Sequence, residues 1–298
     1  MLTALFVVAR IVANPVSNVF QKQLAQRSAG PLFIIAAIHA LLTLACLPIV
    51  FLFPLPLDPR FWTNIAICAV LAVAGNVLLV YALVSAGLSV LGPINAYKSV
   101  ISLVLGVFLI GEIPTPMGAA GVLLIVAGSY FVVDRDASQL SRGAFAAFFG
   151  QRGIQFRFAA LALSATEAVF LKKALLASSP LTTFLFWSIL GLPIAAAAFA
   201  LLHTHRLADE VVLFRRHWRA YVCLALATGA MQLTTLLAFG KLQVGYSLAL
   251  FQLSTLLSVF FGYRYFQEGQ IPKRLLGAAI MAAGAMLIAL LGHASTPR

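Results

Sequence analysis

The sequence predicts an all-α membrane protein in which ten transmembrane helices form two inverted five-helix repeats. The first reason is composition: the 298 residues are 62% hydrophobic and 9% charged, and the mean hydropathy is +1.02. A water-soluble domain of this size is excluded by such a composition. The second reason is the length of the apolar runs, because a helix needs roughly 20 residues to cross about 30 Å of hydrocarbon.

Ten apolar runs of suitable length follow one another along the chain. In the first half they cover residues 2–21, 31–53, 61–85, 88–110 and 116–133. In the second half they cover residues 154–177, 180–202, 217–240, 246–266 and 271–291. Segments rich in proline or in charge separate the runs, as expected for the loops between helices.

An internal duplication is the third reason. Ser102, Gly106, Glu112, Pro116, Gly121, Ala127 and Gly128 fall, after a shift of 156 positions, on Ser258, Gly262, Glu268, Pro272, Gly277, Ala283 and Gly284. A weaker echo pairs Val19-Phe20-x-Lys22 with Val169-Phe170-x-Lys172. Because each half holds an odd number of spans, the second half enters the membrane from the opposite side. We predict a first repeat over residues 1–133, a linker over 134–153 and a second repeat over 154–298.

These features together resemble the EamA-like family of the drug/metabolite transporter superfamily. The most specific residues are Gly111-Glu112 with Pro116 and Gly121, repeated as Glu268 with Pro272 and Gly277. The second copy lacks the glycine that usually precedes the glutamate in this family. The resemblance implies a secondary transporter or exporter of small organic metabolites and leaves the metabolite open. We expect Glu112 and Glu268 to cap or orient their turns.

Polar groups inside the apolar spans mark the candidate site, because a charge at the centre of a bilayer persists only with a partner or water. In the first span Arg10, Asn14 and Asn18 recur every four residues and therefore share one helix face. They could line a cavity, or Arg10 could extend to the membrane surface while the amides bind neighbouring helices.

Two further charges lie near span centres. Lys98 shares a helix face with Asn95 and Ser99, and Glu167 lies midway along the sixth span. Lys98 could bind an anionic substrate group or form a buried structural pair with Glu167. Glu167 could carry a coupling proton or pair with a cationic group. Further candidate substrate-binding residues are Asn76, Tyr81, Gln232, Gln252 and Ser254, each of which could instead hydrogen-bond a neighbouring helix. We expect Trp187 to contact lipid or to serve packing.

Other classes of function find no support in the sequence. No nucleophile elbow, zinc-protease motif or phosphate-binding loop occurs, so we expect no enzyme, no cofactor and no use of ATP. We expect His203, His205, Asp209, Glu210 and His217 to lie in a solvated charged loop and to bind no metal. The net charge of +12 resides in short loops, where lipid and topology explain it better than nucleic acid.

The charge distribution also predicts an orientation. Loops and helix edges on one side carry thirteen Lys and Arg residues, and the other side carries five. The positive-inside rule places the thirteen in the cytoplasm of a multi-pass inner-membrane protein, with both termini outside. The family resemblance implies the opposite, with both termini in the cytoplasm.

We therefore expect a secondary-active or facilitative transporter of amino acids or related zwitterionic or anionic metabolites, which works by alternating access to a midplane cavity. Protons are a candidate coupling ion, membrane lipid is a partner, and the protein is a monomer or a homodimer. An exporter of amphipathic drugs or cations, a lipid-headgroup flippase and a non-transporting membrane scaffold are the alternatives.

Overall fold

The computed structural model describes residues 2–85, 91, 94–95, 97–132, 150–202 and 207–267, together with 276–277, 279–281, 283–284 and 286–287. In these residues every regular element is a helix, which confirms the all-α class. Seven helices are long and apolar enough to cross a membrane, and two more apolar helices are shorter. The predicted tenth span lies largely outside the described residues. The count of ten spans and the two-repeat organisation stay predictions.

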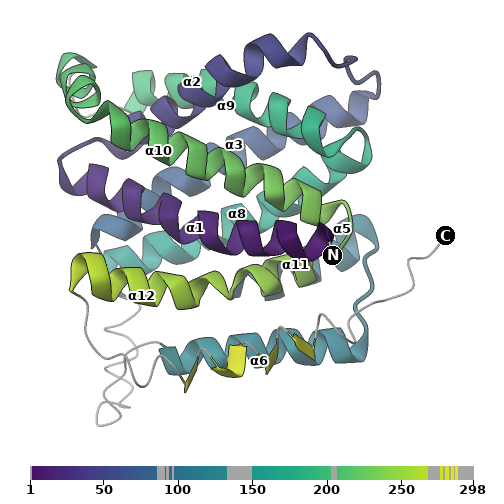
Figure 1. Ribbon diagram of the computed structural model, residues 1–298. Helices are drawn as coiled ribbons and strands as arrows, with labels where there is room; N and C mark the ends of the chain where they lie inside the picture. Colours follow the sequence, from purple (N-terminus) through teal and green to yellow (C-terminus); the bar gives the residue numbers. More distant parts are fainter. Residues whose placement is uncertain are drawn as a thin grey trace.

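The helices run side by side across the molecule, and the termini of most are marked in the sequence (Figure 1). Proline occupies the first position of four of them, where its missing N–H costs nothing. The helices are α1 (Leu2–Gln26), α2 (Pro31–Val50), α3 (Pro59–Ser85), α5 (Tyr97–Ile110), α6 (Pro116–Val132), α8 (Arg152–Leu176), α9 (Pro180–Leu202), α10 (Leu207–Phe239), α11 (Val244–Phe251) and α12 (Ser254–Phe266).

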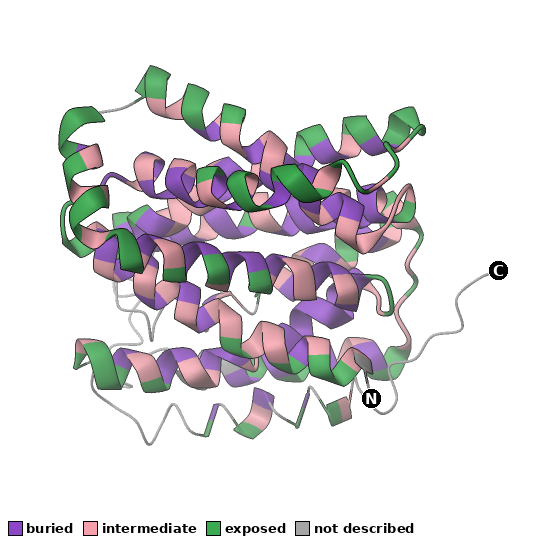
Figure 2. Cartoon of the chain, turned by 45° about the horizontal axis from the view of Figure 1, so that its top comes forward, coloured by how far each residue is buried: buried purple, intermediate pink, exposed green. Residues whose placement is uncertain are grey.

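Neighbouring helices come from opposite halves of the chain. The closest associations are α3 with α8, α1 with α10 and α2 with α9. Buried residues lie between these helices, and exposed residues face outward (Figure 2). A twofold relation between the halves would produce this packing of first-half helices against second-half helices. It also surrounds the centre of the bundle with side chains from both halves.

A separate packing contact involves the glycines that repeat along the chain. A Cβ atom on Gly128 would lie 2.6 Å from the carbonyl oxygen of Gly277, and one on Gly284 would lie 2.6 Å from that of Gly121. Only glycine permits such an approach. α6 lies at the edge of the bundle in Figure 1, so this contact is remote from the bundle centre.

Two predicted segments differ in the structure. α10 begins at Leu207, ten residues before the predicted span, so the expected charged loop around Asp209 and Glu210 is helical. Glu210 is buried and accepts a hydrogen bond from the backbone N–H of Gly30 at 2.8 Å. The predicted ninth span corresponds to residues 244–266, where a turn at Gln252 and Leu253 with helical backbone angles separates α11 from α12. The predicted linker lies mostly outside the described residues.

Candidate functional site

A cavity of about 100 Å³ lies among the helices at the centre of the bundle. That volume accommodates several water molecules. Helices α1, α3, α5, α8, α9, α10, α11 and α12 all contribute to its lining. Its polar and charged lining residues are Arg10, Asn14, Asn18, Asn76, Asn95, Lys98, Arg157, Ser164, Glu167, Trp187, Thr228, Gln232, Thr235, Ser254, Thr255 and Ser258.

The polar face of α1 borders this cavity, as its four-residue spacing predicts. The Arg10 Nε donates to Thr235 Oγ1 at 2.7 Å, and the guanidinium lies 5.0 Å from the centre of the Phe251 ring. Asn14 Nδ2 donates to Ser254 Oγ at 3.1 Å. The buried Nη1 of Arg10 has no hydrogen-bond partner in the described part of the chain. Arg10 is therefore held inside the bundle by residues of the second half, and its Nη1 can still donate a hydrogen bond.

Lys98 enters the cavity from the first turn of α5. A turn at Asn95 precedes this helix, and Asn95 Nδ2 donates to Gln252 Oε1 at 3.3 Å. The turn between α11 and α12 therefore meets the start of α5.

Glu167 faces the same cavity from the middle of α8 and is 9% exposed. Its Oε1 accepts a hydrogen bond from Cys68 Sγ at 3.5 Å. Lys98 and Arg10 both act on this carboxylate electrostatically. Neither forms an ion pair with it within 4 Å, so the alternative of a direct structural pair between Lys98 and Glu167 is not realised in the described residues.

Nine of the twelve candidate binding residues line the cavity, and three do not. Tyr81 is 37% exposed and lies against Phe156, with ring centres 5.5 Å apart. Ser99 is fully buried in the packing of α5. Gln252 lies behind the lining, where it holds Asn95. These three therefore lie outside the lining of the cavity.

Seven polar lining residues were not among the candidates: Arg157, Ser164, Trp187, Thr228, Thr235, Thr255 and Ser258. Arg157 was counted from the sequence among the basic residues of loops and helix edges, yet it is buried and donates through Nε to the carbonyl of Leu91 at 3.2 Å. Its spacing of seven from Ser164 on α8 places both on one face, which was a usable signal. Trp187 is 2% exposed, which excludes the lipid contact and agrees with the packing role that was expected as the alternative. Its ring lies 4.9 Å from that of His39, and its N–H has no partner among the described residues.

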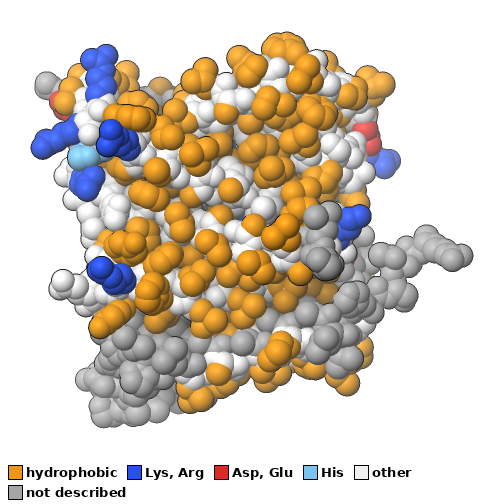
Figure 3. Space-filling model, viewed as in Figure 1, with side chains coloured by type: hydrophobic (Ala, Val, Ile, Leu, Met, Phe, Trp, Pro, Cys, Tyr) orange, Lys and Arg blue, Asp and Glu red, His pale blue; other side chains and the backbone are white. Residues whose placement is uncertain are grey.

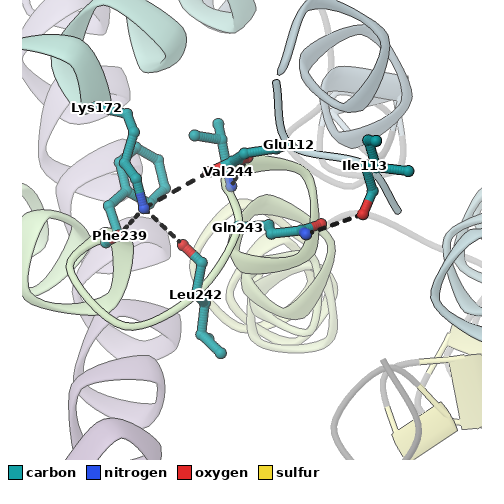
Figure 4. A network of polar contacts seen from close by, with 7 residues as sticks. All are labelled: Glu112, Ile113, Lys172, Phe239, Leu242, Gln243 and Val244. Atoms are coloured by element: carbon teal, nitrogen blue, oxygen red, sulfur yellow. Dashed lines mark hydrogen bonds and ion pairs between the residues drawn. The ribbon is translucent and has the colours of Figure 1, made fainter. Parts of the chain in front are cut away.

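Part of the cavity lining is apolar and is backed by a polar network. Leu171, Phe239 and Leu248 belong to this part. Immediately behind it, Lys172 Nζ donates to the carbonyl oxygens of Phe239 and, at 3.1 Å, of Leu242 (Figure 4). Lys172 thereby satisfies carbonyls at the C-terminal end of α10.

Glu112 completes this network. Its Oε1 lies 3.6 Å from Lys172 Nζ, and its Oε2 accepts the backbone N–H of Val244 at 2.8 Å (Figure 4). Gln243 Nε2 adds a hydrogen bond to the carbonyl of Ile113 at 3.1 Å. Glu112 therefore orients its turn and caps the start of α11, the role expected for it from the sequence. The equivalent expectation for Glu268 lies outside the described residues.

Comparison with known proteins gives a family match over the first part of the chain, and a fold. Residues 1–134 match the model of the EamA-like transporter family. No curated protein matches the chain. Among 28 matching chains of solved structures, one known only as the crystal structure of a protein has a TM-score of 0.70 and 14% identity over 97% of both chains. At this identity the likeness shows the fold alone.

Proposed function

We propose that this chain, whose residues 1–134 match the model of the EamA-like transporter family, carries small zwitterionic or anionic metabolites such as amino acids across the membrane. One observation supports this substrate class above others. Arg10, Lys98 and Arg157 line one central cavity with Glu167 as the single carboxylate among its lining residues, and none of the four forms an ion pair within 4 Å in the described residues.

The balance of these charges favours an anionic group on the substrate. Three cations and one carboxylate give the lining a formal charge of 3 − 1 = +2. Unpaired charges inside a bilayer are costly and are kept where they meet a substrate, an ion or water. A carboxylate or phosphate could accept from the free Nη1 of Arg10 and from the Trp187 N–H. A hydrophobic cation would meet net repulsion in the same place.

Glu167 and the asparagine amides of the lining suit the ammonium group of a zwitterionic substrate. Glu167 could accept from a substrate ammonium group, and Asn18 and Asn76 border the same space. The carboxylate could alternatively take up a proton when one side of the carrier opens, which would couple transport to a pH gradient. Substitution with glutamine separates these roles, since it retains hydrogen bonding and removes proton exchange.

Alternating access requires the two ends of the cavity to open in turn. Behind Phe239 and Leu171 the network of Lys172 and Glu112 links α8 to the end of α10 and the start of α11. If the cavity opens here, these helices separate and at least part of that network breaks. A scaffold protein would have no need for so polar a cavity, and a flippase would need one open to lipid.

The test is uptake into proteoliposomes that contain the purified protein. A panel of radiolabelled amino acids and small carboxylates would be measured with and without an imposed pH gradient, for wild type, Lys98→Ala and Glu167→Gln. Lys173→Ala, one residue from Lys172 and remote from the cavity lining, serves as the control. We expect Lys98→Ala to lose flux and Glu167→Gln to lose its dependence on the gradient. Full flux in both variants would contradict the proposed site.

We also propose that the basic end of the bundle faces the cytoplasm of an inner membrane, which leaves both termini outside. A reporter enzyme that is active only in the cytoplasm, fused after Arg298, tests the orientation. We expect no activity; an active reporter would reverse the orientation and leave the cavity argument unaffected.

A further inference from the structure

A second group of cations lies at the end of the molecule where α10 begins. Arg27, directly after α1, meets Arg216, His217, Trp218 and Arg219 of α10 around a shallow pocket. Figure 3 shows basic side chains and a histidine gathered at this end, on a face that is otherwise largely hydrophobic. This pocket is distinct from the central cavity and shares no lining residue with it.

The three arginines of this pocket lack anionic partners. None of them has a carboxylate within 4 Å in the part of the chain that the structure describes. Arg27 Nη1 instead lies 3.0 Å from His217 Nδ1, and since arginine can only donate, the histidine nitrogen accepts. The Arg219 guanidinium lies 5.6 Å from the Trp218 ring. Like charges gathered in this way favour binding of an anion.

The backbone adds to this preference. α10 is broken at His217, where φ is −119° and ψ is 24°, so a new helical stretch begins at Trp218. Its first residues, Trp218 to Ala220, line the pocket. The N-terminal end of a helix carries a partial positive charge and attracts phosphate groups. Side chains and backbone therefore favour the same kind of ligand.

The position of the pocket along α10 indicates that the ligand belongs to a membrane lipid. Residues 218–239 of this helix rise about 33 Å at 1.5 Å per residue, close to the roughly 30 Å of a hydrocarbon core. The pocket thus lies at the depth of the lipid headgroups. Trp218 is 51% exposed, and tryptophan is typical of this depth. Leu207 and Val212, in the stretch before the break, are also exposed to the surroundings.

We infer that this pocket binds the phosphate of an anionic phospholipid headgroup. Arg216 and Arg219 hold the phosphate oxygens by charge-assisted hydrogen bonds, and Trp218 lies beside the upper acyl chain. The site is independent of the proposed substrate and of the direction of transport. It anchors the junction between α1 and α10 on the basic side of the membrane.

The test measures lipid binding to the purified full-length protein by native mass spectrometry, with phosphatidylglycerol and phosphatidylcholine as probes. We expect wild type to bind phosphatidylglycerol in preference to phosphatidylcholine. The Arg216→Gln/Arg219→Gln variant should bind phosphatidylglycerol about tenfold more weakly. Arg60→Gln/Lys241→Gln is the matched control, because it removes two exposed basic residues at the other end of the bundle. Binding in the control should equal that of wild type.

Two further arms keep the inference open to refutation. Arg216→Lys/Arg219→Lys keeps the charge and removes the paired donors of arginine, so intermediate binding is expected even if the glutamine variant is unstable. Inorganic phosphate at 10 mM should not displace the lipid. Equal loss in the Arg60/Lys241 control, unchanged binding in the glutamine variant, or displacement by phosphate alone would overturn the assignment.

Discussion

Two lysines inside the bundle, Lys172 and Lys98, differ in the hydrogen bonds and ion pairs that their ammonium groups form. Lys172 lies behind the apolar part of the cavity lining and is engaged by two backbone carbonyls and the carboxylate of Glu112. Lys98 lines the cavity itself, and in the described residues its ammonium has no hydrogen bond and no ion pair. Both charges are costly to bury.

The difference separates a structural role from a binding role. The charge of Lys172 is compensated within the chain. Removing Lys172 would leave its partners unsatisfied and lower the stability of the protein. Among the lining residues of the cavity, Glu167 is the one carboxylate that can compensate the charge of Lys98, and the two form no ion pair within 4 Å. Removing Lys98 should therefore damage the interaction with a ligand and leave the fold intact. The following variants test this contrast.

The largest expected effect is on transport by Lys98→Met. A charge-assisted hydrogen bond contributes about 1.5–3 kcal/mol, so flux should fall roughly ten- to a hundredfold. The midpoint of thermal unfolding should stay the same or rise, because an unpaired buried charge has been removed. Proteoliposome uptake and a thermal unfolding assay in detergent measure the two quantities. Loss of folded protein at unchanged specific flux would reverse the assignment.

Lys172→Met should show the reverse pattern. The methionine keeps an unbranched apolar chain, while the carbonyls of Phe239 and Leu242 and the Glu112 carboxylate lose their partner. We expect a loss of about 2 kcal/mol in stability, and a lower unfolding midpoint. The neighbour Lys173, whose ammonium lies 5.6 Å from the Phe170 ring, supplies the matched variant Lys173→Met. An equal midpoint in the two variants would show that the network does not stabilise the protein.

A smaller effect is expected from Trp187→Phe. Phenylalanine retains an aromatic ring against His39 and removes only the N–H donor. A neutral hydrogen bond to the substrate is worth about 1 kcal/mol, which corresponds to roughly a fivefold loss of flux. Trp62→Phe, which removes a hydrogen bond to the carbonyl of Pro56 in an exposed loop, is the control. Identical flux in both variants would mean that Trp187 contributes to packing and does not bind the substrate.

The smallest effect should come from Tyr81→Phe. The structure places Tyr81 against Phe156 and away from the cavity lining, so uptake should remain within about twofold of wild type. A larger loss in the same flux assay would mean that the tyrosine reaches the substrate in another conformation of the carrier.

Much of the site follows from helical spacing. Arg10, Asn14 and Asn18 could be predicted because a repeat of four in an apolar span leaves one polar face, and that face lines the cavity. Lys98 and Glu167 stood out because charges are rare in such spans. The fold class followed from composition and span length, and the first positions of several helices from proline.

The remaining features depend on tertiary packing. The turn at Gln252 and Leu253 is not marked by glycine or proline, and Gln252 there accepts a hydrogen bond from Asn95 in the other half. The early start of α10 was missed because its charged residues resemble a loop, whereas Glu210 is buried against the N–H of Gly30. Arg157 was missed because the predicted span began only three residues before it.

The charged lining of the cavity also has an electrical consequence. Moving one elementary charge through a membrane potential of 100 mV changes its free energy by about 2.3 kcal/mol. In the proposed carrier, a lining with a formal charge of 3 − 1 = +2 would make the reorientation of the empty form sensitive to voltage. A bound substrate with one net negative charge would halve that charge, so the loaded and the empty forms would respond unequally to the same potential. The cell's voltage would then set how quickly the carrier returns for its next substrate.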